Sequence, residues 1–273
     1  MDSFLATQIS KAQAFIGHNG FSEPLDFDVS ELSGKLQLSL FETNRPDAAQ
    51  NAVEQYNALF GTKYSFSELC ELDCESDILK AVCFIGVFFT NITPTYHIEL
   101  VNQRALITAR IAYDLASLPT NHYLLPHEAY LVTYMSFAGS MVLASKYEED
   151  YTLFFERYNL TPYSTSKEES ITFGMSSHFI SAAICATWGI DSNLIKGVLG
   201  SQYQDLNFLT DPQVRTVAGT ILLASCLNRY MQGFEGDEFM EMLEHSQKVT
   251  QVSDKDLDRI LAKTRLNASR MII

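Results

Sequence analysis

The chain has 273 residues, 47% of them hydrophobic, which is typical of a soluble globular protein with a substantial core and argues against intrinsic disorder. Lys and Arg number 19 against 33 Asp and Glu, so the formal net charge is -14. Because a surface this acidic repels nucleic-acid phosphates and anionic lipid, we expect neither nucleic acid nor a membrane surface as a partner.

The sequence carries no sign of export or of a membrane anchor. Its first residues lack the basic start and apolar stretch of a signal peptide, and its longest apolar run, residues 81–89, is shorter than the roughly 20 residues that span a bilayer. We therefore expect a cytoplasmic protein. The cysteines are odd in number and mostly flanked by apolar residues, which favours buried, reduced thiols: Cys70, Cys74, Cys83, Cys185 and Cys226. Cys70 and Cys74 could share a helix face, but two thiolates without further donors make a poor zinc site.

Apolar residues recur at three- and four-residue steps along nearly every long segment, which predicts helices. Residues 35–41 alternate instead, but a lone strand has no ladder partner, so we expect an extended lead-in or a short helix there. Ser65–Glu68 and Ser166–Glu169 have the form of a capping box, which predicts helix starts. Asp211–Pro212 and Ser253–Asp256 predict two further helix starts.

No repeat, low-complexity tract or linker divides the chain. We therefore expect an all-α fold in a single compact domain of a dozen or so helices. Within it we expect an N-terminal helix and extended lead-in over residues 1–34, the main helical body over 35–235, and C-terminal helices packed on the same domain over 236–273.

Four segments, taken in order, match motifs that occur together in one family. Residues 46–61 are similar to D-P-x-L-x-x-x-L-L-x-x-x-N-S-A-x-Y-G, and residues 64–73 to I-x-S-I-x-x-A-I-x-x-L-G. Residues 129–143 keep the apolar frame and the glycine, Gly139, of the helix written A-x-L-x-G-L-L-H-D-I-G-x-x-V-L. Residues 177–190 are similar to s-H-x-x-v-G-x-x-L-x-x-x-W-G-L. Together they resemble the HDOD family, bacterial signalling relatives of the HD metal-dependent phosphohydrolases.

The resemblance implies HDOD-specific N-terminal helices over 35–95 and an HD-like, phosphodiesterase-like core over 96–235. HD enzymes hold their metal ions with an early His, a His-Asp pair, later histidines and a distant Asp. Carried onto this sequence, those positions fall near Gln103 and Arg104, on Ser136 and Phe137, near Ser201 and Gln202, and on Ser225. Only His178 is retained. Since a catalytic divalent ion usually needs three or more protein ligands, the resemblance implies that the metal site is lost, and we expect no cofactor.

The retained motif residues have structural interpretations beside functional ones. His178 is interpreted first as a core histidine hydrogen-bonded to a neighbour, and alternatively as a pocket contact to a ligand. Trp188 is interpreted as a core anchor at a helix end before Gly189. Asn57 and Gly61 suit a turn, because Asn satisfies free backbone groups and Gly permits positive φ.

No P-loop, dinucleotide fingerprint, nucleophile elbow or zincin motif occurs. We therefore expect a non-catalytic bacterial signal-transduction module that acts through protein partners or a small nucleotide-like ligand. Its candidate pocket residues are Ser136, Phe137, His178, Gln202 and Ser225. The alternative is a divergent metal-dependent phosphohydrolase that acts on nucleotides or phosphodiesters. The partner, the input signal and the oligomeric state do not follow from the sequence.

Overall fold

The structure, a computed structural model, describes residues 3–18, 35–73, 77–158 and 165–271. In these ranges the chain forms fifteen α-helices and no strand. The helices are α1 (Ser3–His18), α2 (Lys35–Asn44), α3 (Pro46–Phe60), α4 (Phe66–Asp73), α5 (Asp77–Thr90), α6 (Tyr96–Ala116), α7 (Pro126–Met135), α8 (Ala138–Lys146), α9 (Glu148–Tyr158), α10 (Ser166–Phe173), α11 (Ser177–Thr187), α12 (Ser192–Gly200), α13 (Pro212–Met231), α14 (Asp237–Thr250) and α15 (Asp254–Met271). The all-α prediction is confirmed, and 35–41 belongs to a helix.

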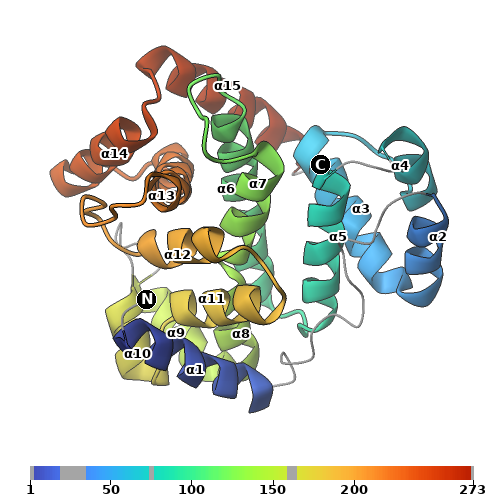
Figure 1. Cartoon of the computed structure of the whole chain (residues 1–273), viewed down its shortest axis with the longest axis horizontal. Helices are drawn as coiled ribbons and strands as arrows, with labels where there is room; N and C mark the ends of the chain where they lie inside the picture. Colours follow the sequence, from blue (N-terminus) through green and yellow to red (C-terminus); the bar gives the residue numbers. More distant parts are fainter. Residues whose placement is uncertain (1–2, 19–34, 74–76, 159–164, 272–273) are drawn as a thin grey trace.

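Two groups of buried side chains form the core, and α6, α7 and α12 contribute to both. The first half of α6 buries Ile98 and Ala105 with helices α1 to α5 and α7 to α12. The second half buries Ile111 and Leu115 with α12 to α15. In Figure 1 the long helix α6 accordingly lies near the middle of the molecule, and α13 lies beside it. Because α6 has buried side chains in both groups, it joins the two parts of the core into one packed body.

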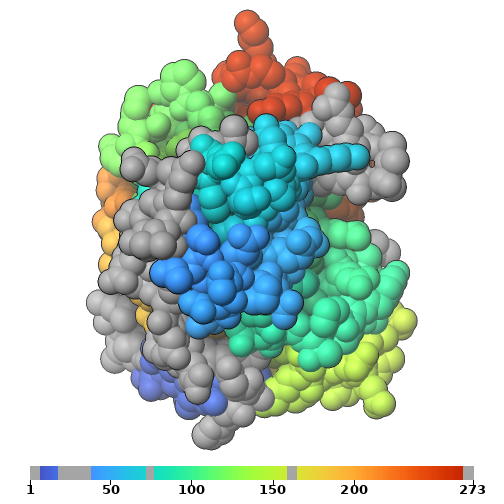
Figure 2. All heavy atoms as spheres, turned by 90° about the vertical axis from the view of Figure 1, so that its right-hand side faces the viewer, coloured from blue at the N-terminus to red at the C-terminus, as the bar shows by residue number. Residues whose placement is uncertain are grey.

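The helices at the two ends of the chain pack on this core. Helix α1 lies against α11 (Figure 1) and buries Ala12 and Ile16 completely. Helices α2 to α5 cover one face of the molecule, which Figure 2 turns toward the viewer. At the other end α15 packs on α6, where Lys263 Nζ lies 2.6 Å from the buried carboxylate of Asp114. Among the helices described, none combines the length and the apolar character needed to cross a membrane.

Several predicted helix starts are confirmed. The Asp211 carboxylate accepts hydrogen bonds from the backbone N–H groups of Gln213 and Val214 at the start of α13. At α4 the Ser65 N–H donates to Glu68 Oε2 at 2.7 Å, and the Glu68 N–H donates back to the Ser65 hydroxyl at 3.4 Å. Each of these bonds satisfies an amide group that the helix itself leaves without an acceptor.

Two expectations at helix boundaries are wrong. Residues 129–143 do not form one helix: α7 ends at Met135, α8 begins at Ala138, and Ser136 and Phe137 lie at the junction. Residues 166–169 do not form a capping box, because the N-cap of α10 is Thr165 and the Glu169 carboxylate accepts hydrogen bonds from the N–H and the hydroxyl of Ser177. Both departures occur at the cavity described below.

The cysteines are free and buried wherever the structure describes them: Cys70, Cys83, Cys185 and Cys226. This confirms the expectation of reduced thiols for those four. Burial raises the pKa of Cys185 and of Cys226 to about 12, so both stay protonated at neutral pH. Cys74, and with it the proposed pairing with Cys70, lies outside the described residues.

Candidate functional site

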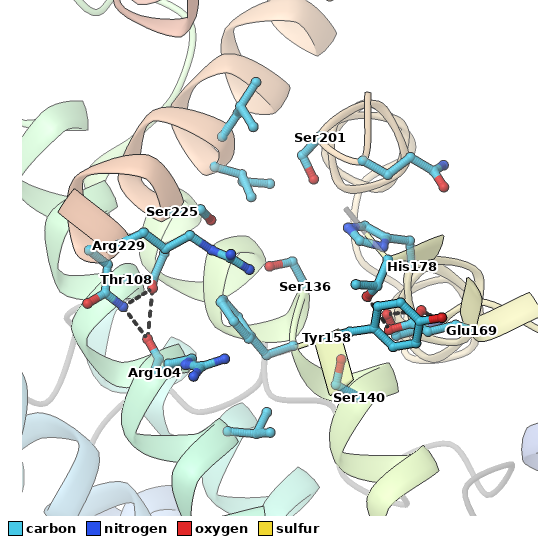
Figure 3. A pocket seen from close by; sticks show the side chains of 18 of the residues that line it. Arg104, Thr108, Ser136, Ser140, Tyr158, Glu169, His178, Ser201, Ser225 and Arg229 are labelled. Atoms are coloured by element: carbon cyan, nitrogen blue, oxygen red, sulfur yellow. Dashed lines mark hydrogen bonds between the residues drawn. The ribbon is translucent and has the colours of Figure 1, made fainter. Parts of the chain in front are cut away.

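A cavity of about 190 Å³ lies between α6, α13 and the helices α8 to α12. The structure brings all five predicted pocket residues to its wall: Ser136, Phe137, His178, Gln202 and Ser225. Arg104 and Ser201, which also fell at positions of HD metal ligands, line the same cavity. Residues that lie between positions 104 and 225 of the sequence thus line one cavity (Figure 3).

The junction between α7 and α8 is held against α11 by a short chain of hydrogen bonds. The Gly139 N–H donates to the Ser181 hydroxyl at 2.9 Å, and that hydroxyl donates to the Ser136 carbonyl at 3.1 Å. A Cβ atom on Gly139 would collide with the backbone carbonyl of Ser177. A glycine is therefore needed for α8 to approach the start of α11, and this approach presents Ser136 to the cavity beside His178.

His178 lies in the first turn of α11 and lines the cavity. Its Nδ1 is 3.0 Å from the Ser166 hydroxyl of α10. Burial lowers the pKa of His178 to about 4, so the ring is neutral at pH 7. The two interpretations of this residue are therefore compatible, since it is hydrogen-bonded to a neighbour and also faces the cavity.

Glu169 is a cavity residue that the sequence analysis missed. It is 4% exposed, and its Oε2 accepts hydrogen bonds from the Ser177 N–H and hydroxyl, both at 2.7 Å. Its Oε1 accepts from the Thr165 hydroxyl at 3.2 Å. Burial raises the pKa of this carboxyl, and the three hydrogen bonds oppose that rise. The carboxylate acts as the cap of α11, a role that its place in an apparent capping box concealed.

Two arginines reach the cavity from the side opposite His178 and Glu169 (Figure 3). Arg104 comes from α6, with its guanidinium carbon 5.3 Å from the centre of the Phe155 ring, and Arg229 comes from the last turn of α13. Burial lowers the pKa of Arg104, and burial together with the Arg104 charge lowers the pKa of Arg229 to about 10. Both remain cationic at pH 7. The sequence analysis named Arg104 only as a vacated metal position and missed Arg229.

The cavity does not fit the metal ions of HD enzymes. In the described ranges no group of three or more His, Cys, Asp or Glu side chains could hold an ion. At the cavity wall those residue types are represented by His178, Glu169 and Cys226, and both Glu169 oxygens already accept hydrogen bonds. The cationic Arg104 and Arg229 would also repel a divalent cation.

The other motif residues lie away from the cavity. Asn57 Nδ2 donates to the Tyr64 carbonyl at 2.8 Å, and Gly61 ends α3 with a φ of 68°. Trp188 ends α11 and packs edge-on against Phe84, with ring centroids 4.9 Å apart. Gly189 follows it with a φ of 76°. None of these four lines the cavity.

No family model matches the sequence, and no curated protein sequence matches it. Solved structures do match. A "Putative phosphohydrolase" from Shewanella amazonensis SB2B is 16% identical over 99% of this chain and 97% of its own, with a TM-score of 0.66. An HDOD domain protein of unknown function from Geobacter sulfurreducens is 16% identical over 97% of both chains, with a TM-score of 0.60. The MmoQ response regulator of Methylococcus capsulatus is 14% identical over 91% of this chain and 92% of the solved fragment, with a TM-score of 0.50. The chain therefore has an HDOD-like fold.

Proposed function

We propose that this chain is a non-catalytic regulatory module of bacterial signal transduction, which has lost the HD metal site and acts in the cytoplasm by binding protein partners or a small ligand. The observation that carries the proposal is the composition of the cavity wall. Where HD enzymes place a His-Asp pair and a distant Asp, this chain has Ser136, Phe137 and Ser225. A phenyl ring has no donor atom, and a neutral serine hydroxyl is a much weaker ligand for a catalytic divalent ion than an imidazole or a carboxylate.

The remaining cavity groups support the same conclusion. His178 alone could serve as a neutral nitrogen ligand, but Glu169 is engaged in holding the start of α11. Arg104 and Arg229 bring positive charge to the same cavity, which disfavours a bound cation there. A regulatory role is also consistent with the fold, which is shared with an HDOD domain protein and with a response regulator. In such a role the occupied and empty states of the cavity would favour different contacts with a partner.

The second candidate function is a divergent metal-dependent phosphohydrolase. It is favoured by the retention of His178 in the cavity and by the fold shared with the Shewanella protein that is named as a phosphohydrolase. Since a shared fold hosts many activities, this candidate depends on chemistry that the cavity wall would have to supply.

Turnover assays distinguish the two. The full chain is incubated with bis(4-nitrophenyl) phosphate and with cyclic dinucleotides, with and without added Mn²⁺. We expect no turnover above the Mn²⁺ blank, and we expect His178→Ala to behave like the unmodified protein. Turnover that requires Mn²⁺ and disappears in His178→Ala would instead establish the hydrolase.

A further inference from the structure

We propose that the cavity binds a small dianionic oxyanion, which Arg104 and Arg229 hold between them. The inference builds on the proposed function, since it assigns a ligand class to a cavity that does no chemistry. The charge of the whole chain and the charge at the cavity have opposite signs. The chain carries a formal charge of -14, yet two of its 19 basic residues reach this one cavity. Glu169 is the one carboxylate among the described residues that line it.

Among the described residues that line the cavity, the charged side chains are Arg104, Arg229 and Glu169. His178 is neutral at pH 7, because burial holds its pKa at about 4. Glu169 lies across the cavity from the arginines in Figure 3, and its oxygens face Ser177 and Thr165. The two guanidinium groups are close enough for the charge of Arg104 to lower the pKa of Arg229. An anion near both guanidinium groups would offset this repulsion with an attraction to each of them.

The hydrogen-bonding groups also favour an anion. The hydroxyls of Ser136, Ser201 and Thr108 each donate to a carbonyl of their own helix or helix end, at 2.7 to 2.8 Å. They therefore have no further proton to donate to a ligand. The guanidinium groups supply N–H donors in the planar arrangement that matches carboxylate and phosphate oxygens. Arg104 and Arg229 therefore bring cationic donors to the cavity wall.

The volume limits the ligand's size. A cavity of about 190 Å³ is smaller than the roughly 300 Å³ at which pockets for drug-sized molecules begin. It suits a single phosphate group or a short dicarboxylate, and it is small for a whole cyclic dinucleotide. Two cationic side chains match two negative charges, which phosphate monoesters and dicarboxylates share.

Calorimetric titration of the full chain tests the proposal. Inorganic phosphate and malonate are titrated separately at pH 7, with sodium chloride keeping the ionic strength constant. We expect saturable binding of at least one of them to the unmodified protein. Arg104→Gln and Arg229→Gln should each weaken that binding about tenfold or more, because each removes a charge-assisted contact. Arg259→Gln removes an equal charge from the exposed surface of α15, and it should change the affinity by less than about twofold.

Binding of phosphate alone would identify a phosphate-bearing ligand, and binding of malonate alone would identify a dicarboxylate. Either result supports the proposal. It is overturned if the unmodified protein binds neither anion, or if all three arginine variants bind as the unmodified protein does. Because the unmodified protein is itself a test, a variant that fails to fold does not rescue the idea. A failure here leaves the absence of catalysis untouched, since that is decided by the turnover assays.

Discussion

At the scale of single residues, the cavity is defined by side chains whose ordinary ionisation has been changed by burial. His178 is the clearest case, because its pKa falls from 6.5 to about 4. Glu169 shows the opposite direction, since burial raises the pKa of its carboxyl. Both shifts favour the neutral form, whereas the two arginines keep their charge at pH 7. The wall therefore presents two positive charges and a neutral imidazole, together with the Glu169 side chain that accepts hydrogen bonds from Ser177 and Thr165.

The shift at His178 predicts a pH dependence of stability. Below pH 6.5 the histidine of the unfolded chain takes up a proton that the folded chain resists, so stability is full above pH 6.5 and is lost as the pH falls toward about 4. The difference between a pKa of 6.5 in the unfolded chain and about 4 in the folded chain lowers the free energy of unfolding by at most about 3 kcal/mol. His178→Asn keeps a polar group near Ser166 but removes the titration, so its free energy of unfolding should fall less over this range.

Denaturant unfolding at several pH values measures this effect, with His122→Asn in an exposed loop as the control. Identical pH profiles for His178→Asn and the unmodified protein would show that the ring titrates normally and that burial of His178 has been misjudged.

The sequence motifs identified part of this wall and missed the rest for a physical reason. Ser136 and Phe137 were found because they lie in a recognisable motif, and Gln202 and Ser225 because the resemblance carries ligand positions of HD enzymes near or onto them. Arg229 occupies none, and an arginine in the last turn of a helix is expected anyway from the helix dipole. Its place at the cavity arises only when α13 packs beside α6, which no local pattern reveals.

At the scale of helices, periodicity and capping chemistry predicted most elements, and tertiary contacts decided the exceptions. The Asp211 cap and the Ser65–Glu68 box formed as expected. The alternation of residues 35–41 was misleading, because Leu38 and Phe41 point into the core from a helix. The break at Ser136 and Phe137 was not predictable, because apolar residues continue through it and only the packing on α11 requires it.

The contact between α8 and α11 predicts that Gly139 cannot be replaced by a larger residue without loss of stability. Gly139→Ala would place a methyl group against the Ser177 carbonyl, and the two helices would have to separate. We expect the free energy of unfolding to fall by about 1–3 kcal/mol, as for other overpacked cores. Ser145→Ala, also in α8, should change it by less than about 0.5 kcal/mol. Equal stability of the two variants would contradict the close packing described for Gly139.

At the scale of the whole molecule, the fifteen helices of the described residues form a fold that the Shewanella and Geobacter proteins share at 16% identity. Such low identity is compatible with a conserved fold, because a packed core constrains volume and pattern more than residue type. The motifs expected over residues 35–235 were sufficient to indicate this fold. They carried no information about α14 and α15, which the structure shows packed on α13 and α6.

The central claim is that this chain has lost the metal site of HD enzymes and has Arg104 and Arg229 at the same cavity. Elemental analysis tests this claim most directly. The purified full chain is equilibrated with Mn²⁺, Fe²⁺ or Zn²⁺, passed through gel filtration, and assayed for metal content per chain. Because His178 is the one histidine among the described residues that line the cavity, and two arginines line it as well, we predict far less than one ion per chain for each metal. One or more manganese, iron or zinc ions held firmly per chain would contradict the account.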